Sequence, residues 1–331
     1  MLNVTRLQVF ASVARHASVT RAAQELHYAQ PSVSHHLARL EAETGATLTQ
    51  RSGRGIRLTD AGRLLAGRAE EILGRLDAAE RELAAHVEQR QERIRLAGFA
   101  SALATIVPAA LSRLAAGHPG IDLLLTEAEE PEAMRMLRAG QVDVALVARH
   151  MQDGTLIGPP TDTEGARARL VLDEQVHLVT RPQPGSAQGD NGGRGGGEGG
   201  RPDLAAHAHS PWIAGCEHCR GHLVWLCQHA GFSPKIAFTT DDHVAAQAIV
   251  AAGLGVTILP SLAIRAARHP GIHTQPLPGA WRQVFAVTYG QPPGPRAVDH
   301  LLDILTLAAA AAATGPGPAS PRNGKPAEGG G

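Results

Sequence analysis

The sequence predicts an α/β protein: short N-terminal helices with a hairpin, then one long helix, then a larger region of alternating strands and helices. Three observations lead to this prediction. Apolar residues recur at helical spacing through roughly the first forty positions. The stretch 60–90 is charged, favours helix and contains no proline. From Ile94 onward, short β-type runs alternate with stretches rich in Ala and Leu.

The overall composition is that of a globular protein. The chain has 331 residues, of which 43% are hydrophobic, so it can bury the cores of two or three domains. It has no apolar run of membrane-spanning length, and residues 1–10 lack the features of a secretory signal. We therefore expect a cytoplasmic protein without a membrane partner. The Gly-rich stretch 185–201 predicts a flexible loop, and 314–331 predicts a disordered tail.

Three short helices are expected before residue 45. Ser18 can cap the second, over 19–26, because its hydroxyl can accept a hydrogen bond from a free backbone amide. Pro31 suits the first turn of the third, where its missing N–H costs little. The first and third helices each carry an apolar stripe: Leu7, Phe10 and Val13, and Val33, Leu37 and Leu40.

The other face of the third helix has the chemistry of a DNA reader. It presents Gln30, Ser32, Ser34, His35 and Arg39, side chains that can bond base edges or phosphates. Two short strands, 46–48 and 55–58, then flank an arginine-tipped wing at 51–54. Residues 1–68 contain nine arginines and four acidic residues, although the whole chain is neutral. The alternative is a purely structural three-helix segment with a solvated polar face.

A long helix is expected from the N-cap Thr59 to about residue 89. An apolar stripe follows coiled-coil spacing along it: Leu65, Ala69, Ile72, Leu76, Ala79 and Leu83. The narrow stripe and the charged remaining faces favour dimerisation. The alternative is a helix packed against its own domain.

The region from residue 91 onward follows a β-α-β-α-β order, which predicts a parallel sheet flanked by helices. Strands are expected at 93–98, 121–126 and 142–147. A second unit is expected to begin with a strand at 169–180, and the chain to return to the first unit near 281–289.

A cluster of thiols and imidazoles interrupts the second unit. Cys216, Cys219 and His222 are candidate ligands of a metal such as zinc, and Cys-x-x-Cys can also be a redox pair. No distant second ligand pair is present, and a helix here would place Cys227 on a buried face. The odd number of cysteines, three, argues against a disulfide framework.

The N-terminal stretch SVTRAAQELHYAQPSVSHHLARLEAETG, followed by LTQRSGRGIRLTDAG, closely resembles the winged helix-turn-helix of LysR-type transcriptional regulators. The matching elements extend over about sixty residues without a gap, which makes them far more specific than a short motif. The matching positions include Ser18, Thr20 to Ala23, Gln30-Pro31, Ser34, Leu40-Glu41, Gly45, Arg51, Leu58-Thr59 and Gly62. A looser resemblance continues through 108–256.

This resemblance implies a domain order and a set of DNA contacts. The expected order is a DNA-binding winged helix-turn-helix at 1–59, a dimerising linker helix at 60–90 and a two-lobed, periplasmic-binding-protein-like effector domain at 91–313. The expected DNA contacts are Thr20, Arg21, Gln30, Pro31, Ser32, Ser34, His35, Arg39, Arg51 and Arg54.

The effector contacts are expected at the carboxyl ends of strands, where open parallel sheets bind ligands. The positions that follow the predicted strands are Ala100, Ser101, Thr126, Ala148 and Arg149 in the first lobe, and Ala214, Gly215 and Thr240 in the second.

The resemblance implies a regulator controlled by a small-molecule effector, with promoter DNA, RNA polymerase and further copies of itself, as a dimer or tetramer, as partners. No cofactor is expected. No enzyme is expected either, because nucleophile-elbow, paired-carboxylate and phosphate-loop motifs are absent from the sequence. The first alternative is a thiol- or metal-responsive regulator sensing through Cys216, Cys219 and His222. The second is a regulator that keeps the fold but binds no effector.

Overall fold

A computed structural model describes residues 2–52, 55–88, 92–157, 165–182, 202–290 and 295–314. The chain divides into two compact units, Met1–Arg95 with Met134–Asp143, and Leu96–Ala133 with Val144–Gly331. The predicted wing residue Arg54, the loop 185–201 and, apart from Thr314, the tail 314–331 lie outside the described residues.

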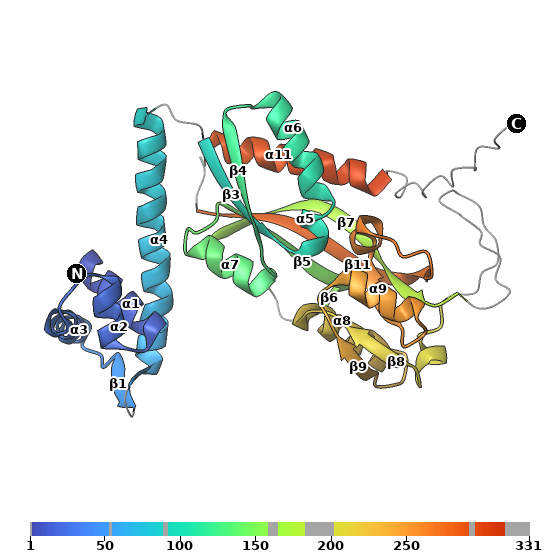
Figure 1. Cartoon of the computed structure of the whole chain (residues 1–331), viewed down its shortest axis with the longest axis horizontal. Helices are drawn as coiled ribbons and strands as arrows, with labels where there is room; N and C mark the ends of the chain where they lie inside the picture. The colour runs from blue at the N-terminus through green and yellow to red at the C-terminus, as the bar shows by residue number, and fades with distance from the viewer. Residues whose placement is uncertain are drawn as a thin grey trace, which may run out of the picture. The chain divides into compact units, whose positions relative to one another are not determined.

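Three helices form the core of the N-terminal unit, as predicted: α1 (Val4–His16), α2 (Val19–Glu25) and α3 (Gln30–Thr44). Figure 1 shows them gathered beside one end of the long helix α4 (Asp60–Glu88). Their apolar stripes meet in one buried cluster that includes Phe10, Val33 and Leu40. Burying these side chains together is what makes the short helices stable.

Local hydrogen bonds set the ends of these helices. The Ser18 hydroxyl accepts from the amide of Arg21 at 3.3 Å, which confirms the predicted cap of α2. The Glu41 carboxylate accepts from the amides of Leu48 and Thr49 at 2.8 and 3.0 Å. It thereby fixes the turn that leads from α3 into the wing.

The wing is a two-stranded antiparallel hairpin of β1 (Thr49–Ser52) and β2 (Gly55–Leu58). The predicted first strand, 46–48, was wrong. The strand begins instead at Thr49, because the Glu41 carboxylate accepts hydrogen bonds from the amides of Leu48 and Thr49. Gly62 packs so closely on the hairpin that a Cβ there would lie 2.0 Å from the carbonyl oxygen of Leu48. Only glycine allows this approach of α4 to the wing.

The long helix α4 uses its apolar stripe in two ways. Leu65 and Ala69 pack with residues of α1, which was the alternative interpretation of this helix. Further along, Ile72, Leu76 and Leu83 remain exposed. The N-terminal part of the stripe therefore attaches the helix to its own domain, and the rest is available for a partner.

A mixed seven-stranded sheet organises the larger unit. Its strand order is β10-β7-β11-β5-β3-β4, with β6 paired to β5. The strands are β3 (Glu92–Gly98), β4 (Ile121–Glu127), β5 (Val144–Gln152), β6 (Thr155–Ile157), β7 (Ala166–Thr180), β10 (Thr257–Pro260) and β11 (His273–Tyr289). A second, two-stranded parallel sheet joins β8 (Pro211–Ala214) to β9 (Lys235–Thr239).

The predicted parallel arrangement holds for β3 with β5 but not for the whole sheet. The long strand β11 pairs antiparallel with both β5 and β7, and β10 pairs antiparallel with β7. Figure 1 shows β7 and β11 crossing this unit from the end that carries α6 and α11 to the end that carries α8 and α9. The sheet is therefore mixed, and its two long strands connect both ends of the unit.

The helices of this unit cover the sheets. They are α5 (Ala100–Leu103), α6 (Ile106–Gly117), α8 (Glu217–His229), α9 (His243–Ala251), α10 (Ser261–Ala266) and α11 (Arg296–Thr314), with a 3-10 turn at Leu204–His207. The helix α7 (Glu130–Arg138) begins in this unit, and from Met134 onward it belongs to the other unit. None of the helices in the described ranges has the length and hydropathy that a membrane crossing requires.

Candidate functional site

The N-terminal unit presents the outer face of α3 to solvent. The helix begins at Gln30, and its apolar stripe of Val33, Leu37 and Leu40 faces the core. The α3 residues predicted to contact DNA are all exposed: Gln30, Pro31, Ser32, Ser34, His35 and Arg39. The fold thus leaves one continuous polar face at the start of the helix.

The neighbouring predicted contacts are exposed as well. Thr20 and Arg21 lie at the start of α2, and Arg51 lies in β1 opposite Ile56 of β2. Arg51 is therefore a strand residue and not a residue of the hairpin tip. Arginines near an exposed helix face suit contacts to a phosphate backbone.

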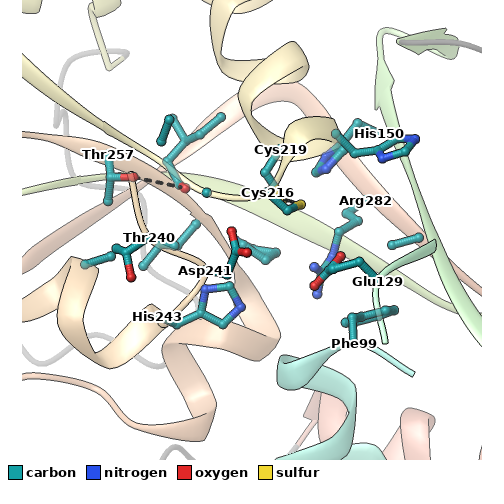
Figure 2. Close-up of a pocket in the computed structure, with 18 of the residues that line it drawn as sticks. Phe99, Glu129, His150, Cys216, Cys219, Thr240, Asp241, His243, Thr257 and Arg282 are labelled. Atoms are coloured by element: carbon teal, nitrogen blue, oxygen red, sulfur yellow. Dashed lines mark hydrogen bonds between the residues drawn. The ribbon is translucent and has the colours of Figure 1, made fainter. Parts of the chain in front are cut away.

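The larger unit contains a pocket of about 730 Å³, including space open to solvent at its mouth. Figure 2 shows ten of its side chains labelled around this space. The lining residues are Phe99, Glu129, Glu130, Ala148, His150, Ile213, Ala214, Gly215, Cys216, His218, Cys219, Thr240, Asp241, His243, Ala246, Thr257, Ile258, Leu259, Pro260 and Arg282.

Four of the eight predicted effector contacts line this pocket: Ala148, Ala214, Gly215 and Thr240. The other four, Ala100, Ser101, Thr126 and Arg149, lie outside the lining. Thr126 is still inside β4, and Arg149 is inside β5, because both strands run further than predicted. Side chains alternate along a strand, so Ala148 and His150 face the pocket while Arg149 lies over the ring of Phe285.

Several charged and polar lining residues were not predicted from the sequence, among them Glu129, Glu130, His150, Asp241 and Arg282. Glu129 and Asp241 come two residues after the observed ends of β4 and β9. The strand-end rule could have found them if the strand boundaries had been known. Arg282 lies in the middle of β11, and no local signal relates it to the others.

Arg282 and Glu174 form a buried ion pair at the edge of the pocket, with side chains only 4% and 3% exposed. The Arg282 Nε donates to Glu174 Oε1 at 2.7 Å, and its Nη2 donates to Ser101 Oγ at 2.9 Å. The guanidinium carbon lies 4.7 Å from the centre of the Phe99 ring. The second Glu174 oxygen accepts from the amide of Leu262 at 2.6 Å. Ser101, predicted as an effector contact, thus binds Arg282.

Two buried imidazoles stack at the pocket: His150, which lines it, and His222, which does not. The rings of His150 and His222 have centroids 4.4 Å apart and are almost fully buried. Burial, followed by the nearby His222 and Arg282, lowers the pKa of His150 well below its usual range. Burial lowers the pKa of His222 to about 4. Both imidazoles are therefore neutral near pH 7.

Cys216 and Cys219 lie at the start of α8 and line the pocket. The Cys216 thiol donates to the Cys219 sulfur, with the two sulfurs 3.0 Å apart. This hydrogen bond, together with the charge of Arg282, lowers the pKa of Cys219 against the opposing effect of burial. The same hydrogen bond and burial raise the pKa of Cys216. Cys219 is therefore the thiol of the pair that loses its proton first.

A metal centre is not formed by this cluster. His222 stacks on His150, and neither of its ring nitrogens has a hydrogen-bond partner among the described residues. Within the described ranges, no three His, Cys, Asp or Glu side chains are arranged to hold a metal ion.

Family models match two stretches of the chain. Residues 4–63 match the family model described as "Bacterial regulatory helix-turn-helix protein, lysR family", and residues 88–310 match the "LysR substrate binding domain". The chain is 28% identical to the HTH-type transcriptional regulator YcgK of Bacillus subtilis, over 82% of this chain and 83% of that protein. It is 30% identical to a probable hydrogen peroxide-inducible genes activator of Mycobacterium avium, over 79% and 78%.

Solved structures share the fold. Full-length CbnR, determined in complex with its target DNA, matches with a TM-score of 0.59 and 22% identity, over 93% of this chain and 100% of that one.

Proposed function

Because the chain belongs to the LysR family of transcriptional regulators, which are not enzymes, we propose that it binds promoter DNA through α3 and the wing and responds to a small molecule in the pocket of its larger unit. The observation that carries the DNA-binding part is the exposed polar face at the start of α3. A helix of this kind fits the major groove, where Gln can pair with adenine and Arg with guanine or phosphate.

The DNA contacts we propose are the predicted ones: Thr20, Arg21, Gln30, Pro31, Ser32, Ser34, His35, Arg39 and Arg51, with Arg54 as a further candidate. The side chains of α3 supply base contacts, and the arginines supply phosphate contacts that set the register on the duplex. CbnR in its complex with target DNA is the related precedent.

We expect Gln30→Ala to weaken specific DNA binding about tenfold to a hundredfold, because a lost bidentate base contact costs roughly 1–3 kcal/mol. Selection from fragmented genomic DNA would first define the bound sequence, and fluorescence anisotropy would then give the Kd. Gln8→Ala, an exposed glutamine of α1, is the matched control and should bind normally. Equal affinity of wild type for selected and scrambled DNA would contradict sequence-specific binding.

The exposed part of the α4 stripe supports a dimer of this chain. Ile72 and Leu76 are 39% and 41% exposed on a helix whose N-terminal part is already packed on α1. Paired copies would place two α3 helices on successive major grooves of a palindromic site. Further assembly to a tetramer is consistent with this arrangement.

Placing charges on this stripe should dissociate the dimer. We expect Ile72→Glu with Leu76→Glu to sediment as a monomer at micromolar concentration, where the wild type sediments as a dimer, because like charges would face one another across the seam. Ala78→Glu adds the same charge to another face of α4 and should leave the dimer intact. A dimer that survives the double substitution would place the interface elsewhere.

The pocket is the proposed effector site. Its lining combines residues that follow β4, β8 and β9 with residues of β5 and β11, so a ligand there contacts segments far apart in the sequence. A ligand that binds one arrangement of these segments better than another shifts the population between them. We propose that this shift changes how the dimer presents its α3 helices to DNA and how RNA polymerase is recruited.

A second candidate input is thiol oxidation, favoured by the 3.0 Å separation of the Cys216 and Cys219 sulfurs in the pocket. The Mycobacterium avium relative is named for hydrogen peroxide, so peroxide is the oxidant to test. The Cys219 thiolate would attack one peroxide oxygen, cleaving the O–O bond and releasing water after protonation. Cys216 would then attack the resulting sulfenic sulfur, forming a disulfide and releasing a second water.

Mass spectrometry after one equivalent of peroxide should show the loss of two hydrogens, confined to the peptide that carries Cys216 and Cys219. Cys216→Ser should stop the reaction at a sulfenic acid that dimedone traps on Cys219. Cys227→Ser is the control and should behave as wild type, because burial raises the pKa of Cys227 to about 12. Oxidation spread over all three cysteines, or none, would argue against the pair as a sensor.

A further inference from the structure

The charges around the pocket are predominantly negative. Glu129, Glu130 and Asp241 line it, whereas Arg282 is the single arginine or lysine of the lining. In Figure 2 the carboxylates of Glu129 and Asp241 approach the open space from different sides, above His243 and beside Arg282. Desolvation raises the pKa of Glu129, although the residue as a whole keeps solvent access. A carboxylate in this situation is stabilised by a nearby positive charge.

The one cation of the lining is already neutralised. Arg282 directs Nε to Glu174 at 2.7 Å and Nη2 to Glu174 and Ser101 at 2.6 and 2.9 Å, and it lies over the ring of Phe99. Its partner Glu174 is as buried as Arg282 itself. A ligand carboxylate would have to compete with this pair, so Arg282 is a poor anchor for an anion.

Three helices that begin near the pocket, α8, α9 and α10, have the chain's own carboxylates at the positive ends that would otherwise attract an anion, whereas α5, which follows Phe99, has no side-chain cap. Asp242 accepts from the amides of Val244 and Ala245 at the start of α9, at 2.8 and 3.2 Å. Glu174 accepts from the amide of Leu262 in the first turn of α10. Glu217 lies in the first turn of α8. These positions leave little positive potential for a ligand anion.

One ring nitrogen of a buried imidazole in the pocket has no hydrogen-bond partner among the described residues. His150 lines the pocket and is 7% exposed, and its Nδ1 has no hydrogen-bond partner within the described chain. Its ring is neutral, and one face is covered by His222 at 4.4 Å. A neutral imidazole can accept a hydrogen bond from a ligand N–H group, and an unpaired buried nitrogen gains from doing so.

We propose that the effector of this pocket is a small organic cation, an amine, amidine or guanidine whose positive group binds between Glu129 and Asp241. Its N–H groups also reach the neutral imidazole wall, and its apolar part lies against Ile213, Ala246 and Leu259. This inference rests on the proposed function of the pocket and gives its ligand a chemical class.

Isothermal titration of the full chain with benzamidine, benzamide and benzoate tests the charge of the ligand directly. The three probes share a ring and a size and differ in charge. We expect benzamidine to bind at least about tenfold more tightly than either of the others, because charged hydrogen bonds are worth roughly 1.5–3 kcal/mol each. Glu129→Gln and Asp241→Asn should each weaken benzamidine about tenfold and leave benzamide unchanged. Asp303→Asn, which changes an exposed acid of α11 outside the lining, is the control and should have no effect.

The possible failures are distinguishable. In the first, benzoate binds more tightly than benzamidine and loses its binding in an Ala214→Trp variant, whose larger side chain fills the pocket. That result would overturn the cationic class and keep the pocket as a ligand site. Benzamidine binding that is indifferent to both Glu129→Gln and Asp241→Asn would overturn the proposed placement. No binding of any probe at millimolar concentration would count against the pocket itself and therefore against the proposed function.

Discussion

Replacing Glu174 by leucine should destabilise the larger unit by about 3–5 kcal/mol, because it leaves Arg282 charged and buried without its counter-ion. Glu174 and Arg282 are directly opposite one another on β7 and β11, the strands that connect both ends of this unit. The substitution also removes the acceptor of the Leu262 amide. The pair therefore links two strands to α10, and through Ser101 to α5.

Urea unfolding followed by tryptophan fluorescence measures this effect, because Trp212, Trp225 and Trp281 all lie in this unit. Asp303→Leu is the matched control. It breaks the exposed ion pair between Arg169 and Asp303, whose side chains are 45% and 64% exposed respectively. We expect it to lower the free energy of unfolding by less than about 1 kcal/mol.

The double variant Glu174→Leu with Arg282→Met separates the charge effect from packing. Replacing both members of a buried pair with apolar residues is often nearly neutral, so we expect the double variant to be more stable than either single variant. A loss of under about 1 kcal/mol in the single Glu174 variant would show that Arg282 finds another partner or solvent.

Replacing Trp212 by alanine should destabilise the larger unit by about 3–5 kcal/mol, because it leaves a cavity in the core. Trp212 is fully buried on β8, its Nε1 donates to the carbonyl of His207 at 3.2 Å, and its ring lies 6.1 Å from that of Phe232. It packs in a cluster with Leu223 and Leu226 of α8. Because β8 leads directly into the pocket residues Ala214 and Gly215, we also expect benzamidine binding to be lost before the unit unfolds.

Circular dichroism during urea titration measures the stability change without depending on tryptophan. Trp281→Ala is the matched control, because Trp281 is 42% exposed on β11 and its loss leaves no cavity. Trp212→Phe should lie between the two. A Trp212→Ala variant as stable as Trp281→Ala would mean that the core around β8 collapses to fill the space.

The sequence by itself determined the N-terminal helices and their caps. The stripes of α1 and α3, the Ser18 cap and the Thr59 cap, whose hydroxyl accepts from the amide of Gly62, depend on residues within a few positions of one another. Local spacing and local hydrogen bonds decide such elements, so they can be predicted without a fold. The resemblance to LysR-type regulators rests on the same short-range signals.

The tertiary structure alone decided where the wing begins and which residues meet in the pocket. The side chain of Glu41 reaches seven residues along the chain to Leu48, and this contact sets the start of β1. The pocket joins Glu129, His150, Asp241 and Arg282, which come from four separate segments. His150 and Arg282 are brought together by the pairing of β5 with β11, where they lie directly opposite one another, and pairing between distant strands leaves no periodic signal in the sequence.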